Sequence, residues 1–246
     1  MNPSESPFVI ADLVARRGDF TLDVPALSAG VGTVIGLVGR NGAGKSTLLQ
    51  VLAGLHRCDR GTVRVFGLDP WKDGDRVRLR TGWMSDDMPI WALRIDELLR
   101  ALRGFYPTWD DALVSSLLDR LELDPRRRVQ TLSKGEHTRI RLLITLAFKP
   151  DLVLLDEPAT GLDVPARRAL LELILGVVRD GTRTVVISSH QVDDIERIAD
   201  RVLLIERGRI TADGTASEVA GSSPNLEERL AAHASTPHSI HSGRVS

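Results

Sequence analysis

The chain has 246 residues, of which 42% are hydrophobic, and this is enough for a large buried core in one or two lobes. Its formal net charge of −1 gives no electrostatic support for nucleic-acid binding, which normally needs a concentrated basic face. The single cysteine, Cys58, excludes an internal disulfide and fits a reducing compartment.

Neither a secretory leader nor a membrane span is expected. Residues 1–7 are polar and lack the apolar core of a signal peptide. The longest uncharged apolar run, Leu142 to Phe148, is far too short to cross a bilayer. We therefore expect a soluble, cytoplasmic protein, whose role at a membrane would come through a partner chain.

The first part of the chain predicts three short strands. They are expected over Phe8 to Leu13, over the alternating Phe20, Leu22 and Val24, and over Thr33 to Val38. A glycine-rich turn follows the last strand, and a leucine-rich helix from Lys45 follows the turn. That helix is expected to stop at Gly54.

The turn matches the G-x-x-x-x-G-K-[ST] pattern in the strand–turn–helix context that makes this pattern credible. Its glycines let the backbone approach phosphate oxygens where a Cβ would collide, and successive N–H groups at a helix start would face a polyanion. Lys45 would place its charge on the β- and γ-phosphates, and the Ser46 hydroxyl would bind Mg²⁺. An incidental glycine turn is the alternative. The residues predicted to bind a nucleoside triphosphate are Gly39, Asn41, Gly42, Ala43, Gly44, Lys45, Ser46 and Thr47.

The middle of the chain is mainly helical. Gly61 to Phe66 should form a short edge strand, and Gly82 to Trp91 is apolar and irregular. Helical spacing and capping patterns then predict three helices. They are expected over Ile95 to Leu102, from a capping box at Thr108 to Leu121, and from Ser133 to about Lys149.

From residue 152 the pattern returns to alternating strands and helices, which is typical of a parallel α/β core. The expected strands are Leu152 to Leu155, Thr184 to Ser188 and Arg201 to Ile205, with helices over Ala166 to Val178 and Val192 to Ala199. We expect one domain over residues 1–220, with a core of about 8–87 and 149–215 and a helical insert of about 88–148. Residues 221–246 should be a partly disordered tail.

Two carboxylates, Asp156 and Glu157, end the first of these later strands. Ligands in open α/β sheets bind at that edge. Asp156 would hold the Mg²⁺ shell, directly or through water, and Glu157 could orient and deprotonate an attacking water. Alone, such a pair is equally consistent with a solvated turn. Behind a phosphate-binding loop it indicates triphosphate hydrolysis.

With these elements the sequence resembles the ATP-binding subunits of ATP-binding-cassette (ABC) transporters. Leu132-Ser-Lys-Gly-Glu136 is similar to the LSGGQ signature of that family, Thr160-Gly-Leu-Asp163 to its D-loop, and Ser188-Ser-His190 to its switch-histidine segment. The resemblance covers about residues 8–215. It implies a P-loop NTPase (RecA-like) core with a parallel sheet, a small N-terminal antiparallel β part and an inserted helical subdomain.

The resemblance also implies a head-to-tail dimer, either a homodimer or a pseudo-dimer, that closes on two ATP. The signature residues Ser133, Lys134, Gly135 and Glu136 would contact the nucleotide bound by the opposite subunit. An ordinary S-x-x-E helix cap is the alternative at this position, and both roles are expected together. His190 would contact the γ-phosphate, unless it is an ordinary loop histidine, and Asp163 would lie at the dimer seam.

Four positions in three motifs depart from the family pattern. Lys134 and Glu136 stand where the family commonly has glycine and glutamine, and Asp86 stands where it has the Q-loop glutamine, a position that can still reach Mg²⁺. Arg17 stands where an aromatic residue usually stacks on adenine, and its guanidinium plane could stack instead. Phe20 is the other candidate, although a core strand residue is also expected there.

A cluster of apolar residues follows the Q-loop position. In the family, the groove between the Q-loop and the helical insert receives a cytoplasmic helix of the membrane subunit. The residues that could supply such a docking surface are Trp83, Met84, Met88, Ile90 and Trp91. Filling of the core between the two lobes is the alternative.

The sequence therefore predicts an ATP- and Mg²⁺-dependent ATPase that drives a separately encoded membrane permease, in the direction of export, from the inner face of the cell membrane. A non-transport ABC-type ATPase that regulates a membrane or cell-division complex is the alternative. A module that binds nucleotide without hydrolysing it is opposed by Lys45, Asp156, Glu157 and His190.

Overall fold

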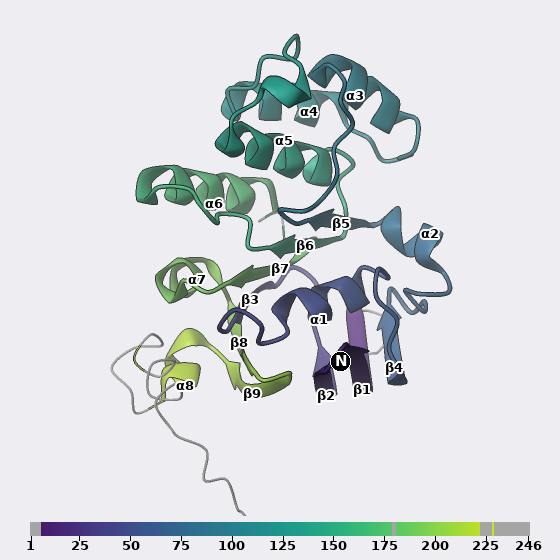
Figure 1. The fold of residues 1–246 in the computed structure, drawn as a ribbon, viewed down its shortest axis with the longest axis vertical. Helices are drawn as coiled ribbons and strands as arrows, with labels where there is room; N and C mark the ends of the chain where they lie inside the picture. The colour runs from purple at the N-terminus through teal and green to yellow at the C-terminus, as the bar shows by residue number, and fades with distance from the viewer. Residues whose placement is uncertain (1–5, 179–180, 222–227, 229–246) are drawn as a thin grey trace, which may run out of the picture.

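The computed structural model describes residues 6–178, 181–221 and 228, and within them the chain forms two β-sheets with helices packed around the larger one (Figure 1). The smaller sheet is antiparallel, in the order β2-β1-β4. Its strands are β1 (Phe8–Arg17), β2 (Phe20–Ser28) and β4 (Arg60–Val65). Gly18, with a left-handed φ of +58°, makes the tight turn between β1 and β2.

The larger sheet has the order β5-β6-β7-β3-β8-β9 and is parallel except for β9. Its strands are β3 (Val34–Val38), β5 (Thr81–Met84), β6 (Leu152–Asp156), β7 (Thr184–Ser189), β8 (Arg201–Glu206) and β9 (Arg209–Gly214). Every residue of β3 is buried, as expected for a parallel strand that is covered on both faces. The carboxyl ends of β3, β6 and β7 share one edge, where such sheets bind ligands.

Helices cover both faces of this sheet. They are α1 (Lys45–Leu52), α2 (Gly74–Arg78), α6 (Val164–Val178), α7 (Val192–Ile198) and α8 (Ala216–Ala220). Val34 and Val38 of β3 join a core with α6 and α7, whereas Ile35 and Leu37 join a second core with α1 and the small sheet. The period-two alternation of one strand thus supplies both cores.

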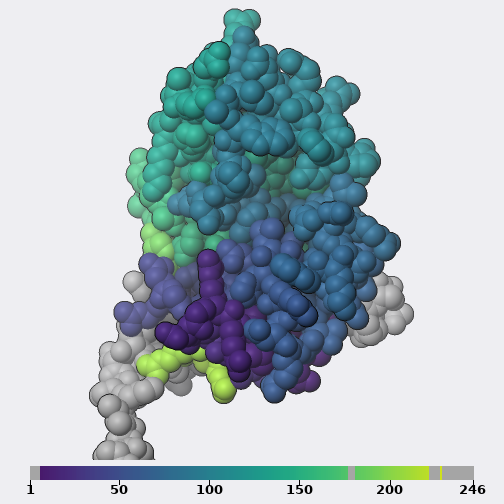
Figure 2. Space-filling model, turned by 45° about the vertical axis from the view of Figure 1, so that its right-hand side comes forward, coloured from purple at the N-terminus to yellow at the C-terminus, as the bar shows by residue number. Residues whose placement is uncertain are grey.

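The remaining helices lie together at one end of the molecule, between β5 and β6 in the sequence (Figure 1). They are α3 (Ile95–Arg103), α4 (Asp111–Arg120), the 3₁₀ turn η1 (Val129–Thr131) and α5 (Lys134–Leu146). Figure 2 shows these teal helices stacked above the purple and blue body. They fall inside the predicted insert, whose boundaries stay a prediction.

The predicted fold class, an α/β core with a parallel sheet and a small antiparallel part, is confirmed. Gly82 to Trp91 was expected to be irregular, and this was wrong for residues 82–84, because their backbone pairs with the buried strand β6 as part of β5. Gly82 allows this: a Cβ there would lie 2.7 Å from the Thr145 carbonyl oxygen. The short elements β9 and α8 were also missed.

The predicted capping box at Thr108 was wrong as well. Asp110 caps α4, because its Oδ1 accepts a hydrogen bond of 2.8 Å from the Leu113 N–H. The Thr108 hydroxyl instead donates to the Phe148 carbonyl, 2.6 Å away, and ties the start of α4 to the end of α5. Several residue types can cap a helix, so the sequence alone did not distinguish the two positions.

The predicted tail, residues 221–246, lies outside the described residues except for 221 and 228. Within residues 6–178, 181–221 and 228, none of the helices combines the length and the apolar character that crossing a bilayer would require.

Candidate active site

The phosphate-binding loop leaves β3 and enters α1 directly. Gly42 and Gly44 have left-handed φ angles of +80° and +113°. Gly44 also lies against the small sheet, because a Cβ there would meet the Phe20 ring at 2.8 Å. Among the described residues no side chain caps α1, so the N–H groups of its first turn face the loop. This conformation presents backbone donors to an anion.

Lys45, in the first turn of α1, is only 5% exposed. Its ammonium group donates to the Gly39 carbonyl at 2.6 Å and lies 3.1 Å from Glu157 Oε1. A buried ammonium group is stable only when it has such partners. The charge of Lys45 is therefore fixed inside the curve of the phosphate-binding loop.

Glu157 is the point where three segments meet. One carboxylate oxygen, Oε1, pairs with Lys45, and the other, Oε2, accepts from the Thr160 hydroxyl at 3.1 Å and lies 2.8 Å from His190 Nδ1. Burial alone would raise the pKa of Glu157, but the charge of Lys45 and the contact with His190 lower it below its usual value. Glu157 is therefore held as a carboxylate, in a left-handed backbone conformation with φ of +50°.

Ser188 organises the two carboxylates from the neighbouring strand. Its hydroxyl donates to Asp156 Oδ1 at 2.7 Å and accepts from the Glu157 N–H at 2.9 Å. The parallel pairing of β6 with β7 places Asp156 opposite Ser188, so the contact follows from strand register. Sequence reasoning gave Ser188 no role of its own, although its place at a strand end beside Asp156 was a usable signal.

The predicted magnesium ligands are only partly brought together. Asp156 lies at the sheet edge, and Ser46 lies half-buried in the first turn of α1. Asp86 is exposed, and no hydrogen bond or ion pair joins it to another residue in the described part of the chain. One carboxylate and one hydroxyl suit Mg²⁺, which keeps several waters and takes its other ligands from substrate phosphates. No cluster of three acidic, histidine or cysteine side chains exists within residues 6–178, 181–221 and 228.

The two candidates for an adenine contact lie beside α1. Arg17, at the end of β1, donates from Nη1 to Gln50 Oε1 at 3.2 Å, so its guanidinium is held over α1. Phe20 is partly buried and packs on the core and on Gly44. The position of Phe20 therefore fits the core role that was also expected for it.

The signature segment lies far from these groups in sequence, at the start of α5. Ser133 and Lys134 are exposed. Ser133 Oγ accepts from the Glu136 N–H at 3.3 Å, and Glu136 Oε2 accepts from the Ser133 N–H at 2.8 Å, which forms the expected capping box. The Ser133 N–H lowers the pKa of Glu136, whose other oxygen pairs with Arg127. Both oxygens of the Glu136 carboxylate are therefore paired with groups of the same chain.

The D-loop lies next to the signature segment of the same chain. A Cβ at Gly161, where φ is +79°, would meet Lys134 Nζ at 2.7 Å. The end of the Lys134 side chain therefore lies against Gly161, which stays exposed. Asp163 is exposed, and its Oδ1 accepts from the Ala166 N–H at 2.8 Å in the first turn of α6.

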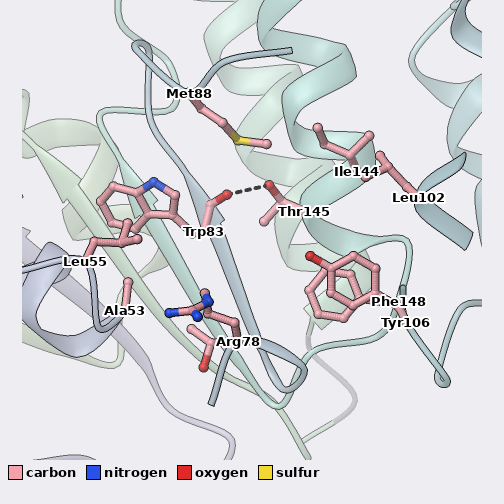
Figure 3. A pocket seen from close by; sticks show the side chains of 11 residues that line it. Ala53, Leu55, Arg78, Trp83, Met88, Leu102, Tyr106, Ile144, Thr145 and Phe148 are labelled. Atoms are coloured by element: carbon pink, nitrogen blue, oxygen red, sulfur yellow. Dashed lines mark hydrogen bonds between the residues drawn. The ribbon is translucent and has the colours of Figure 1, made fainter. Parts of the chain in front are cut away.

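The predicted docking residues differ in how far they are buried. Met84 is 1% exposed and fills the core beneath α3 and α5, so of the two alternatives the core role is confirmed for it. Trp91 is 51% exposed, and Ile90 is partly buried against the core. Trp83 and Met88 line a pocket between the α/β body and the helical insert (Figure 3).

This arrangement matches a known family. Residues 22–160 match the sequence model of the family described as "ABC transporter". The daunorubicin/doxorubicin resistance ATP-binding protein DrrA of Streptomyces peucetius is 37% identical over 220 residues, which cover 86% of this chain and 64% of DrrA. The ABC transporter ATP-binding protein YtrB of Bacillus subtilis is 30% identical over 198 residues, which cover 80% of this chain and 68% of YtrB. The chain thus spans about two thirds of the length of these relatives.

A solved structure described as the ATP-binding subunit of an ABC transporter has the same fold. It superposes with a TM-score of 0.81 at 24% identity and covers 93% of this chain and 99% of that one. This likeness shows that the two chains share their fold. The chain belongs to the ABC transporter family.

Proposed function

We propose that this chain hydrolyses MgATP between two copies of itself and that this cycle drives a separately encoded membrane permease. The observation that carries the proposal is the chain of contacts from Lys45 through Glu157 to His190, at 3.1 and 2.8 Å. These residues follow β3, β6 and β7, so their positions are set by neighbouring strands of one sheet. A phosphate-binding cation, a general base and a switch histidine stand together at the ligand-binding edge.

Nucleotide binding would rearrange the charge of Lys45. With a triphosphate in the loop, the ammonium group would turn from Glu157 to the β- and γ-phosphate oxygens, since these carry more negative charge than one carboxylate. Ser46 and Asp156 would hold Mg²⁺, which neutralises phosphate charge when bound. Gly39, Asn41, Gly42, Ala43 and Thr47 complete the loop that surrounds the phosphates.

Glu157, released from Lys45, would then act as the general base. It would accept a proton from a water that is aligned with the γ-phosphorus, and the water oxygen would attack as the bond to ADP breaks. Because a carboxylate only accepts hydrogen bonds, His190 Nδ1 carries the proton in this pair. A hydrogen bond from His190 Nε2 to a γ-phosphate oxygen would need a second ring proton, on Nε2, because the unprotonated nitrogen and the phosphate oxygen both only accept.

The second half of the site would come from another copy. The corner made by the exposed Ser133 and Lys134 and the partly buried Gly135 would meet the γ-phosphate held by the partner, with Asp163 at the seam. Two features reduce repulsion of that phosphate. Arg127 neutralises Glu136, and the start of α5 is the positive end of its dipole.

The permease would dock in the pocket between the two lobes. Ala53, Leu55 and Trp83 form one wall, and Ile144 and Phe148 of the insert form the other (Figure 3). Trp91 and Leu55 are about half exposed, although both are large and apolar. An apolar pocket whose walls belong to both lobes suits a helix of a membrane subunit. It would hold the chain at the inner face of the cell membrane.

Export is the proposed direction of transport. DrrA is named for resistance to daunorubicin and doxorubicin, and the short helical insert of this chain resembles subunits that serve small export permeases. Purification from native membranes tests the permease proposal: a co-purifying multi-spanning protein would support it, and a purely soluble complex would contradict it.

The test of hydrolysis is Glu157→Gln in the full chain, measured as phosphate release from ATP with Mg²⁺. Loss of the base should lower kcat by about 100-fold or more and leave ATP affinity within a few fold. Asp151→Asn is the control, because Asp151 is a partly exposed carboxylate paired with Arg80 away from the loop. Turnover of Glu157→Gln at the wild-type rate would show that Glu157 is not the base.

A further inference from the structure

We infer that the ion pair of Arg167 with Asp194 is a positioning pair, which holds the D-loop and the switch-histidine segment at a fixed spacing on Glu157. The inference rests on the proposed hydrolytic function. It assigns a role to two residues for which the sequence motifs gave none.

The first observation is where the pair lies. Arg167 is in the first turn of α6, directly after the D-loop, and its N–H donates to the Asp163 carbonyl at 2.9 Å. Asp194 is in α7, four residues after His190. The helices α6 and α7 contact each other and lie one above the other in Figure 1. Each partner is therefore fixed within about one helical turn of an active-site loop.

The second observation is burial. Arg167 Nε lies 3.2 Å from Asp194 Oδ2, and each side chain is only 14% exposed. Burial raises the pKa of Asp194, and the charge of Arg167 opposes that rise. A surface ion pair does little to fix geometry, whereas a pair with so little solvent must keep its partners together. Arg167 Nε makes no hydrogen bond within the described residues, so the contact is one of charge.

The third observation is what the two loops do at their other ends. The Thr160 hydroxyl from the D-loop and His190 from the switch segment both approach Glu157 Oε2, at 3.1 and 2.8 Å. The same two segments are thus joined twice, once at Glu157 and once between Arg167 and Asp194. Loss of the second link would free His190 and Thr160 to move apart on the carboxylate.

The pair would act through geometry, because neither residue is among the groups that contact Lys45 or Glu157. A positioning role predicts a lower kcat with little change in the KM for ATP, since the phosphate-binding loop is untouched. A purely structural role predicts a lower melting temperature and a proportional loss of all activities.

The test is Asp194→Asn in the full chain, which removes the charge and keeps the shape and one oxygen acceptor. We expect kcat to fall about tenfold while the KM for ATP changes less than about twofold, and Asp194→Glu to restore most of the rate. Asp213→Asn is the matched control, because it breaks another Arg–Asp pair, with Arg201, that joins β8 to β9. The control should keep wild-type kcat.

A double-mutant cycle with His190→Ala separates positioning from general damage. The tenfold effect of Asp194→Asn should shrink to less than about twofold when His190 is already absent. An equal loss in both backgrounds, or no loss in the wild-type background, would overturn the inference. If Asp194→Asn does not fold, Arg167→Lys takes its place in the same cycle. If the prediction for Asp194→Asn fails while Glu157→Gln is inactive, the positioning role is wrong and the proposed function is still supported.

Discussion

The two ends of the proposed catalytic centre are built in opposite ways. The sheet edge around Glu157 is largely buried and cross-linked, with contacts from Lys45, Ser188 and His190. The signature corner at Ser133 is exposed, and Ser133 is hydrogen-bonded to Glu136 in its own helix cap. The half of the proposed site that binds phosphate is thus formed within one chain, whereas the half around Ser133 lies on the surface of the chain. This contrast is what the proposed dimer explains.

The largest expected effect comes from the buried end. Lys45→Ala removes the buried ammonium group of the phosphate loop, and ATP affinity should fall about 100-fold or more, because a charge-assisted contact to phosphate is lost. Nucleotide titration of the purified chain measures this. An affinity within about threefold of wild type would mean that ATP is not bound by this loop.

At the exposed end, Ser133→Ala should lower turnover about tenfold without changing ATP binding by the single chain. Thr215→Ala is the matched control, since Thr215 caps α8 with the same reciprocal capping box to Glu218. Both changes should cost about 1 kcal/mol of stability through the lost cap. Equal turnover in the two variants would contradict a role of the signature corner in catalysis.

Ser188→Ala tests the buried cross-links. Losing a fully buried hydroxyl that serves Asp156 and Glu157 should lower the free energy of unfolding by about 1–3 kcal/mol. It should also slow turnover several fold. Thr184→Val removes a buried hydroxyl at the other end of the same strand, where Thr184 bonds the Gly30 carbonyl. Thr184→Val should lower the free energy of unfolding by a similar amount and keep the wild-type turnover rate. If both variants turn over ATP more slowly, Ser188 has no specific role in catalysis.

The smallest expected effect concerns pH. The folded pKa of Glu136 is lowered, mainly by the Ser133 N–H, so its contribution to stability is present above the unfolded pKa and is lost as pH falls through the folded value. Glu136→Gln should therefore make thermal stability less sensitive to acid, with turnover at neutral pH nearly unchanged. Melting curves of both proteins from pH 7 down to about pH 3 measure this, and identical pH profiles would contradict it.

The sequence predicted the buried end better than the exposed one, for a physical reason. Long apolar runs that end in Gly39 or in Asp156 can only be central strands, so the loops after them had to share an edge. The strand at Gly82 was missed because its pairing with β6 depends on a distant partner. Ser188 and Arg167 were missed for the same reason, since their contacts arise from register and helix packing and not from local pattern.

The insert shows the same limit. The helix at Ser133 and its cap could be predicted from local spacing alone. The sequence could not show whether the Met84 side chain faces a partner or the core, because a large apolar side chain suits either environment. In the structure, Met84 packs in the core with residues of α5. Lys134 was expected beside a phosphate, and its position over Gly161 of its own D-loop is a tertiary contact that no motif encodes.

The most direct measurement is the mass of the Glu157→Gln protein in solution, by light scattering, with MgATP and without nucleotide. Slow hydrolysis should trap the closed state, so ATP should convert the 26.9 kDa chain into a species of twice that mass. Adding Ser133→Arg, whose bulk would block the exposed corner, should keep the ATP-bound protein monomeric. A single-chain mass at saturating ATP, or a dimer that tolerates Ser133→Arg, would contradict the claim that each copy completes the site of the other.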